Sequence, residues 1–228
     1  MDKNVVSKVD DFVKIKTILI SVSDKTGLDD FVRNLVRINN DIKILSTGGT
    51  FNKIREALGG NTDNLFRVSD YTKQPETQGG LVKTLDFKIY LGLLTETYND
   101  FHKKDLKRTE ASVIDMVVVN LYPFSETISS KESTAEHARS NIDIGGPCMI
   151  RASAKNYLRV ASVVSPGDYL DIINELEQND GSLNLSFRYK LAVKAFRHTA
   201  DYDRVIAEYY EKLSFSEKIK PCYKENLI

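Results

Sequence analysis

Residues 17–27 read TILISVSDKTG, and residues 42–50 read IKILSTGGT. Each stretch begins as a short apolar run, which is typical of a buried strand, and ends in a turn rich in hydroxyl side chains and glycine. A helix-like pattern follows each turn, at Leu28–Ile38 and at Phe51–Leu58. Two strand–loop–helix units in succession predict a parallel sheet that is flanked by helices.

The rest of the chain continues this alternation. Strands are predicted at Ile18–Val22, Ile42–Leu45, Asp115–Leu121 and Val160–Val164, and helices from Ser133 or Thr134 to Ser140, over Gly146–Tyr157, from Pro166 to Glu177 and over Leu185–Leu213. Residues 61–82 contain no long periodic stretch and are predicted to form a long loop, which in a compact domain is usually functional or disordered. The pattern therefore predicts an α/β fold, with a mostly parallel sheet and a helical C-terminal extension.

The two glycine-containing loops are predicted to hold a phosphate group together. A phosphate needs inward-pointing backbone N–H groups with a helix N-terminus behind them, and hydroxyl or cationic side chains add donors. The candidate residues are Ser21, Ser23, Lys25 and Thr26 in the first loop, and Ser46, Thr47, Gly48, Gly49 and Thr50 in the second. The alternative is that both loops are ordinary helix N-caps. Neither loop has the spacing of a Walker A or dinucleotide-binding motif.

Composition narrows the functional class. The chain has 228 residues with 32 basic and 32 acidic side chains, so its net charge of zero does not favour nucleic acid or an anionic membrane as a partner. No apolar run is long enough for a membrane-spanning helix, and the N-terminal residues lack a hydrophobic signal segment. Cys148 and Cys222 are far apart, which argues against a metal pair or a disulfide framework. A cytoplasmic protein with reduced thiols is expected.

Four polar residues stand at predicted element ends or beside glycines. Lys83 precedes Thr84 at the end of the long loop, and Tyr122 follows the strongest predicted strand, just after Asn120. Asp143 lies before a predicted helix in NIDIGG (141–146), and Lys155 lies twelve residues further on. Taken singly, each fits a solvated surface residue, and Asp143 also fits a helix N-cap. Spacing alone does not assign a reaction.

Several segments together resemble a known family. They are SVSDKTG (21–27), STGGT (46–50), VSD (68–70), VKTL (82–85), VVVNLYPF (117–124), NIDIGG (141–146), RASAKN (151–156) and KAFRHTADYD (194–203). In this order and spacing the chain resembles the IMP cyclohydrolase part of the bifunctional enzyme AICAR transformylase/IMP cyclohydrolase. The resemblance implies a methylglyoxal-synthase-like fold and ring closure of 5-formamidoimidazole-4-carboxamide ribotide to inosine monophosphate. That reaction needs no metal and no cofactor.

The resemblance also implies roles for individual residues. Lys83, Tyr122, Asp143 and Lys155 would be catalytic: Asp143 accepts or orients the carboxamide proton, the two lysines act near the formyl oxygen, and Tyr122 positions or protonates. Asn120 would hold the base or a neighbouring loop. Thr84, Gly145 and Gly146 join the substrate-binding set, and the helix after Gly145–Gly146 would donate backbone N–H groups. On this hypothesis, alanine at Lys155 or Asp143 lowers turnover at least tenfold without unfolding the protein.

The long loop departs from the family pattern. The family usually reads GRVKTLHP, whereas residues 79–87 read GGLVKTLDF, so Leu81 replaces an arginine and Asp86–Phe87 replace a His–Pro pair. Three interpretations follow: Lys73 or Lys88 compensates, the substrate is modified, or the protein binds a phosphorylated metabolite as a regulatory module without turnover. Methylglyoxal synthase itself is less favoured, because NLYPF and NIDIGG match the cyclohydrolase pattern.

The expected organisation is an N-terminal extension over residues 1–14, an IMP cyclohydrolase-like domain over 15–213 and a loosely held tail over 214–228. The resemblance does not extend to the transformylase part of the family. If the protein is active and is not part of a longer chain, a separate AICAR transformylase is an expected partner, next to the ribotide substrate. A homodimer is expected as well, because the family is dimeric.

Overall fold

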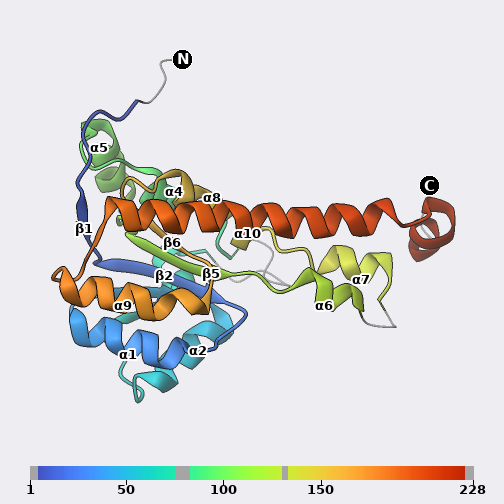
Figure 1. The fold of residues 1–228 in the computed structure, drawn as a ribbon, viewed down its shortest axis with the longest axis horizontal. Helices are drawn as coiled ribbons and strands as arrows, with labels where there is room; N and C mark the ends of the chain where they lie inside the picture. The colour runs from blue at the N-terminus through green and yellow to red at the C-terminus, as the bar shows by residue number, and fades with distance from the viewer. Residues whose placement is uncertain (1–4, 75–82, 130–132, 224–228) are drawn as a thin grey trace.

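The computed structural model describes residues 5–74, 83–129 and 133–223. Its centre is a five-stranded sheet in the order β4-β3-β2-β5-β6, in which every neighbouring pair is parallel (Figure 1). The strands are β2 (Thr17–Val22), β3 (Lys43–Ser46), β4 (Leu65–Arg67), β5 (Met116–Asn120) and β6 (Ala161–Val163). The predicted parallel sheet is confirmed, and the four predicted strands agree with β2, β3, β5 and β6 within about two residues.

Helices cover both faces of the sheet (Figure 1). One face carries α1 (Leu28–Ile38), α2 (Gly48–Ala57) and α9 (Tyr169–Gln178), and the other carries α4 (Phe87–Leu94), α8 (Gly145–Lys155) and α10 (Leu185–Glu211). Successive side chains of a strand point to opposite faces, so Ile18 and Ile20 pack in the first core and Leu19 in the second. The ring of Phe31 stacks on that of Tyr169 at 4.2 Å and joins α1 to α9.

The region predicted to be one long loop contains regular structure. β4 lies within residues 61–82 and is followed directly by α3 (Val68–Thr72). Three strand residues and five helix residues are too short to produce a readable hydrophobic period, although Leu65 and Val68 are both buried. The loop prediction is therefore wrong for this part, and residues 75–82 lie outside the described residues.

Further short elements complete the fold. They are α5 (Asp100–Thr109), α6 (Phe124–Ser129), α7 (Ala135–Ser140) and a 3-10 turn at Pro166–Asp168 that precedes α9. Thr134 caps α7 by accepting from the His137 N–H, as the sequence predicts. No helix in the described ranges is both long enough and apolar enough to cross a membrane.

The two ends of the described chain are attached to the domain. β1 (Phe12–Lys14) pairs antiparallel with β7 (Ser182–Asn184), and the buried Arg188 donates to the Asp10 and Asp11 carbonyls at 2.9 Å each. At the other end, helical turns at Phe215–Ile219 and Lys220–Tyr223 follow α10, and the Tyr223 hydroxyl donates to the Glu136 carboxylate. Residues 1–4 and 224–228, which fall in the expected extension and tail, lie outside the described residues.

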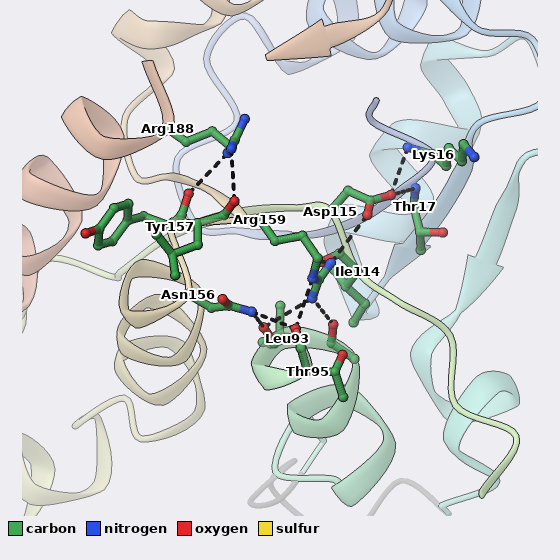
Figure 2. A network of polar contacts seen from close by, with 12 residues as sticks. Lys16, Thr17, Leu93, Thr95, Ile114, Asp115, Asn156, Tyr157, Arg159 and Arg188 are labelled. Carbon is green, nitrogen blue, oxygen red and sulfur yellow. Dashed lines mark hydrogen bonds and ion pairs between the residues drawn. The ribbon is translucent and has the colours of Figure 1, made fainter. Parts of the chain in front are cut away.

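The C-terminal end of α4 is held by side chains from beyond α8 (Figure 2). Arg159, only 6% exposed, donates to the carbonyls of Gly92 at 2.6 Å and Thr95 at 3.1 Å. Asn156 donates to the carbonyls of Leu93 at 2.7 Å and Thr95 at 2.9 Å. A cation and an amide thus satisfy carbonyls that the helix leaves unpaired and fix the direction of α4.

Candidate active site

A cavity of about 480 Å³ lies where the carboxyl ends of the central strands meet the start of α8. Its walls come from the loops after β2, β3 and β5, together with Lys83–Thr84 and residues 140–149. The two glycine-containing loops therefore meet, as the sequence predicts, and the turn after β5 joins them. The volume is within the range of about 300–1,000 Å³ that is usual for small-molecule sites.

The hydroxyl groups of the first two loops contact each other and do not cap the helices behind them. The Ser21 and Thr47 hydroxyls are 2.8 Å apart, and no side-chain bond caps α1 at Gly27 or α2 at Thr47. The Thr50 hydroxyl bonds the backbone of Val22, which joins α2 to the end of β2. The alternative of two ordinary N-caps is therefore not realised in this structure, and a cavity wall rich in hydroxyls and glycine takes its place.

Asn120, the last residue of β5, fixes the first loop. Its Oδ1 accepts from the backbone N–H groups of Ser23 at 2.7 Å and Asp24 at 2.9 Å, and its Nδ2 donates to the Asp24 carbonyl at 2.9 Å. The Asp24 carboxylate accepts in turn from the Thr26 N–H, and hydrogen bonding by the Thr26 side chain and backbone lowers the pKa of Asp24. Of the two roles expected for Asn120, the structure displays the contact with a neighbouring loop.

Replacing Asn120 with alanine is expected to open this loop. Three hydrogen bonds are lost, and two backbone N–H groups lose their acceptor, which costs about 1–3 kcal/mol of unfolding free energy. Hydrogen exchange of the Ser23 and Asp24 amides should accelerate at least tenfold. Asn61→Ala, which removes an exposed turn contact to Asp63, serves as the control and should leave those amides unchanged. If the exchange rates of the Ser23 and Asp24 amides are unchanged in Asn120→Ala, Asn120 does not hold this loop in place.

Three of the four polar residues singled out in the sequence line this cavity: Lys83, Tyr122 and Asp143. Tyr122 is 48% exposed. Asp143 accepts from the Gly146 N–H through Oδ1 at 2.9 Å, so it also caps the turn that begins α8. The capping interpretation and the cavity interpretation of Asp143 are therefore both realised by one side chain, because its second oxygen is not committed to the cap.

The start of α8 requires glycine, because neighbouring side chains lie very close to its backbone. A Cβ on Gly145 would lie 2.4 Å from the Thr84 hydroxyl, and a Cβ on Gly146 would lie 2.5 Å from Asp143 Oδ2 and from Leu121 Cδ2. Neither position accepts a side chain without displacing the cavity wall. These two glycines therefore bring Thr84 and Asp143 against the helix start.

Tyr202, a residue that the sequence interpretation did not single out, holds Asp143 in place. Its hydroxyl accepts from the Asp143 N–H at 2.8 Å, across from α10. Burial raises the pKa of Tyr202, so the neutral phenol is maintained. Burial raises the pKa of Tyr90 on α4 as well, and Cys148 and Asp143 add to this rise. The segment KAFRHTADYD contains Tyr202, but nothing in its spacing indicates that this phenol reaches a loop 59 positions away.

Three predicted site residues do not line the cavity. Lys155 is exposed at the last position of α8, whose 11 residues separate it from Gly145 by about 15 Å. Thr26, near the end of the first loop, is exposed and does not line the cavity. The Ser46 hydroxyl is buried and donates to the Ile20 carbonyl at 2.8 Å, so it serves the sheet. At the start of α8, the Gly146 N–H is bound by the Asp143 carboxylate.

The positions at which the long loop departs from the family pattern have different places in the structure. Leu81 lies outside the described residues. Asp86 is buried and caps α4 by accepting from the Lys88 N–H at 2.8 Å, so it has a helix-starting role of its own, while Phe87 is 61% exposed. Neither Lys73 nor Lys88, the expected compensating residues, lines the cavity. Among the described residues, no group of three or more His, Cys, Asp or Glu is placed to hold a metal ion.

Comparison with known proteins places this chain in a family. The sequence model of the MGS-like domain matches residues 27–148, and that of the AICARFT/IMPCHase bienzyme matches residues 153–227. The bifunctional purine biosynthesis protein PurH of Thermoanaerobacter sp. is 48% identical over 92% of this chain, and PurH of Ruminiclostridium cellulolyticum is 42% identical over 92%. The chain spans about 40% of the length of these relatives.

A solved structure supports the same placement. The crystal structure of ForH superposes with a TM-score of 0.72 at 30% sequence identity, over 86% of this chain and 99% of the ForH chain. The similarity therefore extends to most of the chain. The chain belongs to the MGS-like domain family, and most of its length is related to about 40% of the bifunctional protein PurH.

Proposed function

We propose that this protein is an IMP cyclohydrolase, which closes the ring of 5-formamidoimidazole-4-carboxamide ribotide to form inosine monophosphate. The observation that carries the proposal is the convergence of Lys83, Tyr122 and Asp143 on one cavity with two hydroxyl- and glycine-rich loops. The similarity to PurH supports the same activity.

The proposed reaction is intramolecular. The carboxamide nitrogen gives up a proton and attacks the formyl carbon, so that a C–N bond closes the ring and the formyl oxygen takes up a proton. The resulting hydroxyl then leaves as water with a second proton from nitrogen, so that a C–O bond breaks and a C=N bond forms. The protein has to fold the substrate into a near-attack shape, and such positioning can contribute several kcal/mol. It also has to stabilise charge on the former formyl oxygen, at about 3 kcal/mol for each good donor.

The described residues suggest a division of labour. Asp143 takes the carboxamide proton through the oxygen that is not bound to Gly146, and the Lys83 ammonium stabilises the charge that develops on the formyl oxygen. Tyr122, half-exposed at the cavity wall, orients the imidazole ring of the substrate or donates a proton to the substrate. The loops around Ser21 and Thr47 hold the 5′-phosphate. Lys155 has no role in this proposal, because α8 carries it away from the cavity.

The test is a direct assay with the formamido ribotide. The purified protein should convert it to inosine monophosphate, followed by ultraviolet absorbance and by chromatography of the product. The second candidate, a regulatory module without turnover, is favoured by Leu81 in place of the family arginine. Binding of inosine monophosphate without any product formation would support that candidate and reject the enzyme.

Replacement of Tyr202 with phenylalanine is expected to lower turnover about tenfold and to lower the unfolding free energy by about 1–3 kcal/mol, because the Asp143 N–H loses its acceptor. Tyr210→Phe is the matched control: it lies on the same helix, and in the described structure its hydroxyl has no hydrogen-bond partner. Steady-state kinetics and urea unfolding measure both effects. Equal behaviour of the two variants would remove Tyr202 as a positioning residue.

The proposal has consequences for partners. A formyl-transfer reaction on the corresponding aminoimidazole ribotide has to produce the substrate, so we propose an AICAR transformylase as the supplier and the cytoplasm as the location. We also propose a homodimer. Support comes from one face of α10, where Tyr189, Val193 and Phe196 are 53, 51 and 41% exposed. Light scattering coupled to gel filtration tests the dimer, and a monomer at micromolar concentration rejects it.

A further inference from the structure

A small polar niche adjoins the main cavity on the side of β4. It has a volume of about 20 Å³, room for about one water molecule, and is lined by Ser46, Thr47, Gly48, Arg67, Val68, Ser69, Gln74 and Lys83. Thr47, Gly48 and Lys83 also line the main cavity, so the two spaces share a wall. The niche therefore extends the loop after β3, one of the two loops that we propose to hold the phosphate.

Arg67 reaches this wall because of the strand order. It is the last residue of β4 and lies in register with Ser46, the last residue of β3, so its position is one strand spacing, about 4.8 Å, from the loop that follows β3. Its guanidinium carbon is 4.0 Å from the ring centroid of Phe51, in the first half of α2. The cation is thus held beside the start of α2, on the side where Thr47 and Gly48 lie.

No acidic side chain neutralises Arg67 in the described part of the chain. Its guanidinium lies over the aromatic ring of Phe51, and it makes no hydrogen bond or ion pair with a carboxylate among the described residues. A guanidinium on an aromatic face keeps its N–H groups at its edge, where a second group can accept from them. Arg67 can therefore add a charge-assisted, two-pronged contact to an anion at the Thr47–Gly48 turn.

The main cavity has two other cations in its described wall, Lys25 and Lys83. Lys25 donates to the Ser23 carbonyl at 3.2 Å, within its own loop. Lys73 and Lys88 do not contribute: Lys73 is exposed at the end of α3, and the Lys88 ammonium lies 6.0 Å from the centroid of the Tyr71 ring. Arg67 lines the niche that shares Thr47, Gly48 and Lys83 with the main cavity, whereas neither Lys73 nor Lys88 lines the niche or the cavity.

We propose that Arg67 binds the 5′-phosphate of the ribotide and so compensates for leucine at position 81; this inference rests on the function proposed above. It differs from the compensation expected from the sequence, which named Lys73 or Lys88. Arg67 acts as a specificity-determining residue, because its N–H groups select ligands that carry a phosphate.

The experiment compares Arg67→Met with the wild-type protein by calorimetric titration with inosine monophosphate and with inosine, which lacks the phosphate. Arg67→Met should bind the nucleotide about 10- to 100-fold more weakly and bind inosine as the wild type does. Arg67→Lys, which keeps the charge but not the two-pronged geometry, should fall between the two proteins. Arg55→Met, the same change at an exposed position near the end of α2, is the control and should bind both ligands normally.

Each outcome decides the proposal. Unchanged nucleotide affinity in Arg67→Met overturns it, and an equal loss for nucleotide and nucleoside overturns the phosphate contact. If a thermal unfolding experiment shows that Arg67→Met is not folded, Arg67→Lys supplies the same comparison. Binding is measured without turnover, so a wild-type protein that binds the nucleotide but forms no product rejects the enzyme and still tests Arg67. A wild-type protein that binds neither ligand overturns both.

Discussion

Replacing Asp143 with asparagine is expected to lower turnover of the formamido ribotide at least a hundredfold while the domain stays folded. The amide oxygen of asparagine can still accept from the Gly146 N–H, so the turn that starts α8 is retained. What is lost is the negative charge and the basicity of the second oxygen. General acid–base catalysis by one positioned group typically contributes 10²- to 10⁴-fold, which sets the expected size of the effect.

Two further variants separate the roles of this carboxylate. Asp143→Ala removes the cap as well as the charge, so its turnover should fall as far as that of Asp143→Asn and its unfolding free energy should fall by a further amount of about 1 kcal/mol. Asp41→Asn, an exposed aspartate just before β3 at the opposite edge of the sheet, should behave as the wild type. Turnover by Asp143→Asn within threefold of the wild type would exclude this carboxylate as the base.

Replacing Arg159 with methionine is expected to lower the unfolding free energy by about 3–5 kcal/mol, the usual cost of leaving a buried ionic partner alone. The Asp115 carboxylate, 7% exposed, would lose its cation, which lies 3.4 Å away. The carbonyls at the end of α4 would lose their donor (Figure 2). Urea unfolding, with the transition followed by circular dichroism, measures the effect.

An exposed arginine gives the matched control. Arg204 is 57% exposed and pairs with Glu208 at 2.8 Å on the surface of α10, so Arg204→Met should cost no more than about 1 kcal/mol. In the double variant Arg159→Met/Asp115→Asn the loss should be smaller than the sum of the single losses, because no unpaired charge remains. Equal destabilisation by Arg159→Met and Arg204→Met would show that the buried network does not stabilise the fold.

The fold class could be predicted from the sequence because it depends on local signals. The buried runs of β2, β3 and β5, each followed by a turn and a helix, predict a parallel sheet, and a parallel sheet brings the ends of its strands to one edge. This alone places Ser21, Thr47 and Asn120 near one another, and the structure confirms it. β4 and α3 were not predicted, because elements of three and five residues carry no readable period.

Side-chain partners over long sequence separations could not be predicted in this way. Asn120 was expected to contact the base or a loop, and its bonds to Ser23 and Asp24 depend on where β2 and β5 pair. Tyr202 reaches Asp143 because α10 crosses the start of α8, an arrangement that no spacing within either segment reveals. Lys155 was grouped with Asp143 by the family pattern, although a straight helix places them at opposite ends.

Residue type and period are enough to predict the α/β class, the loops at the edge of the sheet and the four polar candidates Lys83, Tyr122, Asp143 and Lys155, because burial and hydrogen-bonding capacity are local properties. The tertiary structure alone decided which polar groups are neighbours. It joins Arg67 to the loop after β3 through the strand order, and it commits the Ser46 hydroxyl to the sheet. The physical reason is that a contact depends on the packing of whole elements, and local pattern does not encode that packing.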